Sequence, residues 1–322
     1  MKKALLILTF LCLASLPALA QVNDTYIITA AANQGGGFGT RWLTQFSVFN
    51  PHLDYDLVVS ITFLPTGGAQ GIEELVKVPA NSLAYSDNLL WDLFGVEGGG
   101  SLLVATFVED NPGRDTVLKR AFLVTSNTYN NSSDGTFGQT IPGVWAGLLD
   151  FDFDSISAIS QGIRNDSVNG WRTNIGAVNL GRCNVTMRVF VYDADGRTIL
   201  NNAPFIIPPM AHFQDRLPVQ VEAGSVEFLI EDPCASSAQN YAVVFPYTST
   251  IDVLSGDPTY QAPALLASPS ELFSLAKKAT NIDPTSVGKK IDSEYARGIR
   301  ALAEHRGMAT LTRDAKGWRI TK

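Results

Sequence analysis

The sequence predicts an all-β protein of two tandem β-sandwich (Ig-like) domains with a small C-terminal helix-helix-hairpin segment. Three observations predict it. A strand motif occurs twice, many short alternating apolar runs lie between Gly- and Pro-rich turns, and after Pro263 the apolar residues change from strand spacing to helical spacing. The expected boundaries are 1–20 for a signal peptide, 21–145 and 146–262 for the two sandwiches, and 263–322 for a basic helical tail with a terminal hairpin.

The repeated motif is GTRWLTQFSVFNP at 39–51 and GWRTNIGAVN at 170–179. When Trp42 is aligned with Trp171, every second residue is similar in both copies, and alternate residues of a strand share one face. We therefore expect both tryptophans to anchor the core, with a sugar-stacking platform as the alternative. Asn50 and Asn179 end the two strands and are expected to cap turns. Two copies of about 110 to 120 residues indicate a domain duplication, because solenoids use shorter and more numerous repeats.

A later strand, VTMRVFVYDADGR at 185–197, places three aliphatic side chains on its core face. Arg188, Phe190 and Tyr192 then lie on the opposite face and form a possible ligand surface. Exposed aromatic rings on a sheet can stack on sugars, but the tail or the other domain can equally cover them. We favour a covered surface.

The tail begins with SPSELFSLAKKAT, in which Ser268 and Glu271 form a capping box. A second helix is expected from about Asp283, and ATLTRDAKGWRITK at the end has the pattern of a hairpin. From residue 260 onward there are 11 Lys and Arg against 6 Asp and Glu, although the whole chain has a net charge of −7. We expect this basic tail to dock on the acidic body or on an anionic wall polymer.

The first 20 residues have two lysines, an apolar run and an Ala18-Leu19-Ala20 ending. This is the pattern of a secretory signal peptide cleaved between Ala20 and Gln21, so the protein is expected to be secreted or periplasmic. No segment is long and apolar enough to be a confident transmembrane span. The acidic body excludes nucleic acid as a partner and favours an unidentified protein or a cell-envelope glycan.

Removal of the signal peptide leaves two cysteines, Cys183 and Cys234. An even number of cysteines in an exported chain favours a disulfide. A metal site or a reactive thiol is the alternative, and no CxxC pair or neighbouring histidine supports it.

Aspartates offer further metal-site candidates. Asp150, Asp152 and Asp154 recur at every second residue, and Asp252 and Asp257 flank a Gly turn. A charged sheet edge and ordinary turn chemistry explain these residues. A calcium site is the sharper alternative, because its ligands are oxygen atoms. No other cofactor is expected.

No catalytic motif is present. The three histidines, His52, His212 and His305, lie in separate segments without metal-ligand spacing. A Ser-His-Asp triad assembles only in space, so a hydrolase requires His212 to lie beside a serine and a carboxylate. The sequence favours a non-enzymatic structural or binding module, with a carbohydrate-binding module as the alternative and a secreted hydrolase third. The favoured structural or binding module predicts no concave polar pocket and a covered Phe190 and Tyr192.

Four motifs occur in order between residues 25 and 262: GTRWLT ending in Asn50-Pro51, GTFGQ at 135–139, RTN at 172–174, and DVLSGDP at 252–258. In order and spacing this pattern resembles an uncharacterised family of exported bacterial proteins with paired β-sandwich repeats. The resemblance implies the two-sandwich fold and export, and it implies no activity or ligand. The tail lies outside it.

Overall fold

The computed structural model describes residues 25–36, 39–68, 70–107, 120–132, 135–145, 157–166, 168, 170–181, 183–231, 244–266 and 308–321. Within these residues the protein is all-β, as the sequence predicts, with one short helix, α2 (Leu89–Asp92). The predicted signal peptide, the aspartate row at 150–154, Cys234 and the two predicted tail helices lie outside the described residues. No helix in the described part is long and apolar enough to cross a bilayer.

The N-terminal strands form two layers that one strand joins. The first layer has the order β4 (Ile72–Val78), β3 (Leu57–Pro65), β6 (Gly98–Phe107), β1 (Thr25–Gly35), β9 (Val144–Trp145). The second has the order β5 (Ser82–Ser86), β2 (Arg41–Asn50), β7 (Leu123–Ser132), β8 (Gly135–Pro142). The last residues of β1 also pair with β2, which makes the two layers one continuous sheet.

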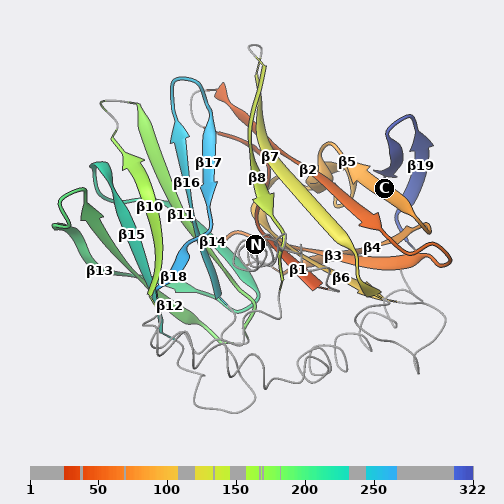
Figure 1. Ribbon diagram of the computed structural model, residues 1–322, viewed down its shortest axis with the longest axis horizontal. Helices are drawn as coiled ribbons and strands as arrows, with labels where there is room; N and C mark the ends of the chain where they lie inside the picture. Colours follow the sequence, from red (N-terminus) through yellow and green to blue (C-terminus); the bar gives the residue numbers. More distant parts are fainter. Residues whose placement is uncertain are drawn as a thin grey trace, which may run out of the picture.

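The C-terminal strands pair in the same order as the N-terminal ones. One sheet is β13 (Thr198–Ile207), β12 (Val185–Asp193), β15 (Val221–Glu231), β10 (Ser157–Asn165), β18 (Ala264–Leu266). The other is β14 (Ala211–Arg216), β11 (Trp171–Asn179), β16 (Val244–Asp252), β17 (Pro258–Gln261). Each strand number is nine higher than that of its counterpart in the N-terminal half (Figure 1).

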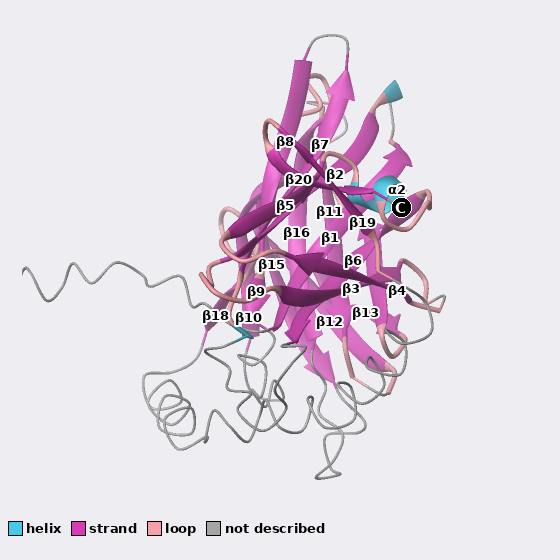
Figure 2. Ribbon diagram, turned by 90° about the vertical axis from the view of Figure 1, so that its right-hand side faces the viewer, coloured by secondary structure: helices cyan, strands magenta, loops and turns pink. Residues whose placement is uncertain are grey.

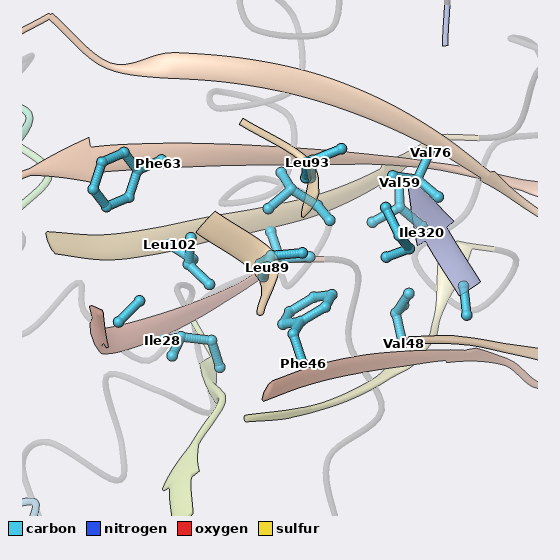
Figure 3. Close-up of a cluster of buried hydrophobic side chains, with 14 of the residues drawn as sticks. Ile28, Phe46, Val48, Val59, Phe63, Val76, Leu89, Leu93, Leu102 and Ile320 are labelled. Atoms are coloured by element: carbon cyan, nitrogen blue, oxygen red, sulfur yellow. The ribbon is translucent and has the colours of Figure 1, made fainter. Parts of the chain in front are cut away.

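Between the N-terminal layers lies an apolar core, in which Ile28 and Leu102 from one layer meet Phe46 and Val48 from the other (Figure 3). Strand β2 alternates as predicted, because every second residue from Trp42 to Asn50 is buried. Helix α2 closes the core with Leu89 and Leu90, which are both fully buried.

A second core fills the C-terminal sandwich, and Met187, Val189 and Val191 of β12 belong to it as predicted. Strand β11 is different, because its last residues are buried on both faces. The sheet that contains β11 is covered by the other C-terminal sheet on one side and by N-terminal strands on the other (Figure 1).

The tryptophan prediction is only partly right. Trp42 is 8% exposed, but it packs in a small cluster with Ala32 and Ile251, outside the two main cores. The expectation of a core role for Trp171 is wrong. Its ring is half-buried near the end of β11 and lies 5.0 Å from the guanidinium carbon of the exposed Arg164.

The two strand-ending asparagines make the same hydrogen bonds in both halves. The Asn50 amide donates to the carbonyls of residues 55, 78 and 79, and the Asn179 amide donates to those of residues 183, 207 and 208. Each side-chain oxygen accepts the backbone N–H two residues later, from His52 and Gly181. Both side chains are fully buried, so each asparagine satisfies several backbone groups that would otherwise have no partner.

The C-terminal hairpin, β19 (Thr310–Asp314) and β20 (Gly317–Thr321), lies on the N-terminal half (Figure 2). Strand β20 pairs in parallel with β5, and Ile320 is fully buried in the N-terminal core. Lys316 and Arg319 form ion pairs with Asp87 and Asp92. This part of the basic tail therefore covers the β5 edge and contacts acidic side chains of the body.

The two halves meet through the outer face of the β14-β11-β16-β17 sheet. Val178 and Phe245 on that face pack against three N-terminal side chains, Ile27, Leu64 and Leu103. A second apolar contact joins the halves where Ile251 packs against Ala32 and Trp42.

Candidate functional site

A polar cavity of about 430 Å³ lies between the two halves. Its N-terminal wall comes from β1, the loop after it, Trp42 of β2 and Gln139 of β8. Its C-terminal wall comes from β11, β14 and β16, with Arg172 and Arg216 among the lining residues. The volume is that of a small-molecule site.

Strand register explains the polar C-terminal wall. Asn174 on β11 pairs with Arg216 on β14 and with Ser249 on β16, so the three side chains form a row on one face of the sheet. In the next row, Gly176 lies between Gln214 and Tyr247. A Cβ atom on Gly176 would overlap the Tyr247 ring, so only glycine allows that ring to lie across the strand.

Arg172 has an unusual environment. Its Nε is buried and has no hydrogen-bond partner, and its side chain forms no ion pair with a described residue. Loss of solvent lowers the pKa of its guanidinium, and the charge of Arg216 lowers it further. An arginine remains protonated in a protein, so a poorly solvated cation stands in the wall next to a second cation.

His212 lies in this wall and links the two halves. Its Nδ1 lies 2.7 Å from the Thr66 hydroxyl of the N-terminal half, and its Nε2 lies 2.7 Å from the Tyr247 hydroxyl. Burial lowers the pKa of His212 to about 3, so the ring is neutral at physiological pH. A neutral ring donates through one nitrogen and accepts through the other, and it binds no serine or carboxylate among the described residues.

Two further contacts hold the cavity walls together. Gln139 and Ser249 are hydrogen-bonded across the interface, with distances of 3.1 Å and 3.2 Å from the Ser249 oxygen to the amide nitrogen and oxygen. At the rim, Trp42 packs against Ile251 of the other half. The walls are therefore fixed by both polar and apolar contacts between the halves.

The predicted ligand surface lies on another sheet. Arg188, Phe190 and Tyr192 occur together on the outer face of β12 and are partly buried, and none of them lines the cavity. Arg188 pairs with Glu231, and the Tyr192 hydroxyl donates to Glu227 at 2.7 Å. That hydrogen bond is the main reason why the pKa of Tyr192 is raised to about 12.

Asp252 stabilises a turn. Its carboxylate accepts the Leu254 N–H and the Ser255 hydroxyl, which lowers its pKa, and its own N–H donates to the Asp257 carbonyl. Asp150, Asp152 and Asp154 lie outside the described residues, where no proximity to this turn can be stated. Among the described residues, no group of three or more His, Cys, Asp or Glu side chains is arranged to hold a metal.

Cys183 precedes β12, and Cys234 lies outside the described residues, so their pairing stays a prediction.

Four cavity residues were singled out by the sequence motifs: Trp42, Gln139, Arg172 and Asn174. The motifs gave no indication that these side chains lie together. Sequence reasoning missed Arg216 and Gln214, because β14 carries no repeated motif. Only the pairing of β14 with β11 brings these two side chains to the cavity.

Comparisons with known proteins indicate no function for this chain, so a functional assignment depends on the geometry of the site. No family model matches the chain, and no curated protein matches it. Among solved structures, a chain of the "Structure of infectious bursal disease virus Gt strain" is 8% identical over 82% of this chain and 86% of that one, with a TM-score of 0.12. So low a score carries no argument about fold or function.

Proposed function

We propose that this chain is an exported, non-enzymatic binding protein that holds a small ligand in the cavity between two tandem β-sandwich domains. The domains correspond to residues 21–145 and 146–262, and the location is the periplasm or the cell surface. The tail at 263–322 contributes the hairpin that covers the β5 edge.

The tandem-domain part of the proposal rests on the matched strand order of the two halves and on the matched bonds of Asn50 and Asn179. Ig-like describes only the sandwich architecture, because β1 pairs mainly with β6, whereas the first strand of an immunoglobulin domain shares a sheet with the second. Export rests on the signal-peptide pattern of the first 20 residues.

The observation that carries the binding function is the polar cavity with walls from both halves. A purely structural module has no need of a polar cavity whose lining includes two arginines without an ion-pair partner among the described residues. A ligand that accepts hydrogen bonds would supply the missing partner to these guanidinium groups.

A hydrolase finds less support. The buried His212 is bonded to Thr66 and Tyr247, which gives it neither a nucleophilic serine nor an orienting carboxylate within its described surroundings. With its pKa lowered to about 3, the ring is also a poor general base near neutral pH.

The second candidate function is a carbohydrate-binding module that uses the outer face of β12. The partly exposed row of Arg188, Phe190 and Tyr192 favours it. Glu227 and Glu231 already engage two of these side chains, so a sugar would have to compete with existing bonds.

One experiment separates the two sites. Purified mature protein, residues 21–322, is tested for retention on an array of cell-envelope polysaccharides. A panel of mono- and disaccharides is then screened for ligands that raise the unfolding temperature of the protein. Ser249→Phe is designed to fill the cavity, and Tyr192→Ala removes a ring from the outer face. The cavity proposal expects Ser249→Phe to abolish every stabilising shift and Tyr192→Ala to preserve it.

The reverse pattern would move the site to the β12 face and support the carbohydrate-binding alternative. Circular dichroism spectra of both variants show whether each is folded. If Ser249→Phe does not fold, Ser249→Leu serves as the smaller replacement.

A further inference from the structure

We propose that the cavity recognises an anion, namely the carboxylate of an acidic sugar, through the paired guanidinium groups of Arg172 and Arg216. This inference rests on the proposed function, because it assumes that the cavity is the ligand site. It adds the charge and the chemical class of the ligand.

Two positive charges in the cavity wall have no counter-ion among the described residues. Arg172 and Arg216 both line the cavity, are close enough for their charges to interact, and form no ion pair with a described residue. Arg172 is partly buried and Arg216 is exposed, and their two positive charges repel each other unless an anion lies between them. A bound carboxylate removes this repulsion and accepts hydrogen bonds from the planar guanidinium groups.

One carboxylate of the protein, that of Asp215, also lies in this wall. Asp215 lines the same cavity, but its side chain is exposed and accepts the backbone N–H of Arg216. It forms no ion pair with either guanidinium. Among the described residues, the titratable side chains of the lining are these two arginines, one aspartate and the neutral His212, so this part of the wall carries a net positive charge.

This sign is opposite to that of the whole chain, which has a net charge of −7. A cationic wall within an acidic protein repels cations locally and draws in anions of small size.

The other side chains of the lining indicate that the carboxylate belongs to a sugar. The lining also contains the amides of Gln34, Gln139, Asn174 and Gln214, which can each donate and accept hydrogen bonds. Trp42 supplies an aromatic surface at the same cavity. Several amides beside an aromatic ring suit a ligand with many hydroxyl groups, and the volume of about 430 Å³ admits a small one.

The test is isothermal titration calorimetry of the mature protein with glucuronate, galacturonate, glucose, galactose and the dipeptide alanyl-alanine. We expect the two uronates to bind at least tenfold more tightly than the matching neutral sugars and the dipeptide. Binding of the uronates should weaken as salt is raised, because an ion pair forms on binding.

Arg172→Gln should weaken uronate binding at least tenfold and leave the weak binding of glucose unchanged. Arg172→Lys should restore only part of the affinity, because an ammonium lacks the planar fork of a guanidinium. Arg188→Gln, on the outer face of β12, is the matched control and should bind as the wild type does.

Thermal unfolding of the ligand-free variants tests for a merely structural role. If Arg172 serves the ligand, Arg172→Gln should unfold at the same or a higher temperature, because a repelled cation has been removed. A clearly lower midpoint would show that Arg172 supports the fold and would contradict the inference.

Equal affinity for glucuronate and glucose, abolished by Ser249→Phe, would overturn anion recognition and leave the cavity function standing. Tighter binding of alanyl-alanine than of the uronates would overturn the sugar class. Uronate binding that persists in Ser249→Phe would contradict the cavity function itself.

Discussion

Asn50 and Asn179 show how one residue type fixes the same local structure twice. Each amide donates to three carbonyls, and two of these belong to a strand end 28 and 29 residues further along the chain. The side chain thus joins the end of its own strand to the end of β4 or β13. No backbone group can substitute for it, because the site needs two donors and an acceptor on one side chain.

Asn179→Ala should lower the free energy of unfolding by about 3 kcal/mol, because it removes the side-chain partner of three buried or partly buried carbonyls and of one buried N–H. Asn50→Ala should lower it by a similar amount. Urea denaturation followed by fluorescence measures both. The exposed Asn201→Ala is the control and should change stability by less than about 0.5 kcal/mol. A large loss at only one of the two sites would contradict their equivalence.

Gly100 and Gly224 occupy equivalent positions in the two halves. A Cβ atom on Gly100 would overlap the carbonyl oxygen of Leu64, and one on Gly224 would overlap that of Tyr192. Both positions follow a register shift between the first strand of the half and its partner. The close backbone approach explains why glycine occurs at the same place in each copy.

At the element scale, the sequence predicted strands better than it predicted their surroundings. The alternation in β2 and β12 appears as expected, because each of these strands has one face on a core and a more exposed one. Strand β11 has the same motif as β2, yet Trp171 is only half-buried and the last five residues of the strand are buried on both faces. Equal sequence patterns lead to different burial because β11 belongs to the sheet that the other half covers.

The terminal hairpin is an element whose importance the sequence understated. Its alternation predicts two arms and a turn, and both are present. The pattern does not identify the partner strand, because β5 lies more than 200 residues earlier in the chain. Only the fold shows that Ile320 completes the N-terminal core (Figure 3).

Ile320→Ala should lower the free energy of unfolding by about 2 to 5 kcal/mol, as expected for truncation of a fully buried aliphatic side chain. The loss should be seen in the urea midpoint of the intact mature chain. Thr312→Ala, at an exposed position on the other arm, should have little effect. If both variants are equally stable, the hairpin does not contribute to the core in solution.

At the scale of the whole molecule, the interface between the halves contains both the apolar contact and the cavity. Thr66, His212 and Tyr247 form a hydrogen-bonded chain across it, in which Thr66 is exposed and the His212 and Tyr247 side chains are buried. The stability of this chain depends on the charge of one ring, since a protonated imidazole in the same place would be a buried cation without a partner.

The pKa of His212 falls from 6.5 to about 3 on folding, so below pH 6.5 the unfolded state binds a proton that the folded state does not. Stability is therefore complete above pH 6.5 and falls as the pH decreases, by up to about 1.4 kcal/mol per pH unit from this group. We expect His212→Asn to lose this component of the pH slope. Tyr247→Phe keeps the buried ring and should keep the slope.

Denaturation midpoints of the wild type and both variants from pH 7.5 to pH 4.5 test this expectation. Parallel curves for wild type and His212→Asn would show that the ring is protonated equally in the folded and unfolded states.

By itself, the sequence determined the all-β class, the strand faces of β2 and β12, the terminal hairpin and the internal repeat. These properties depend on side-chain alternation and turn chemistry, which act over a few residues. The tertiary structure decided which sheet lies between the others, which tryptophan is covered, and that Arg172 and Arg216 share a cavity wall with Gln139 of the other half. Those outcomes depend on contacts between strands far apart in the chain. A local sequence pattern does not indicate which sheet face of one half packs against which sheet face of the other.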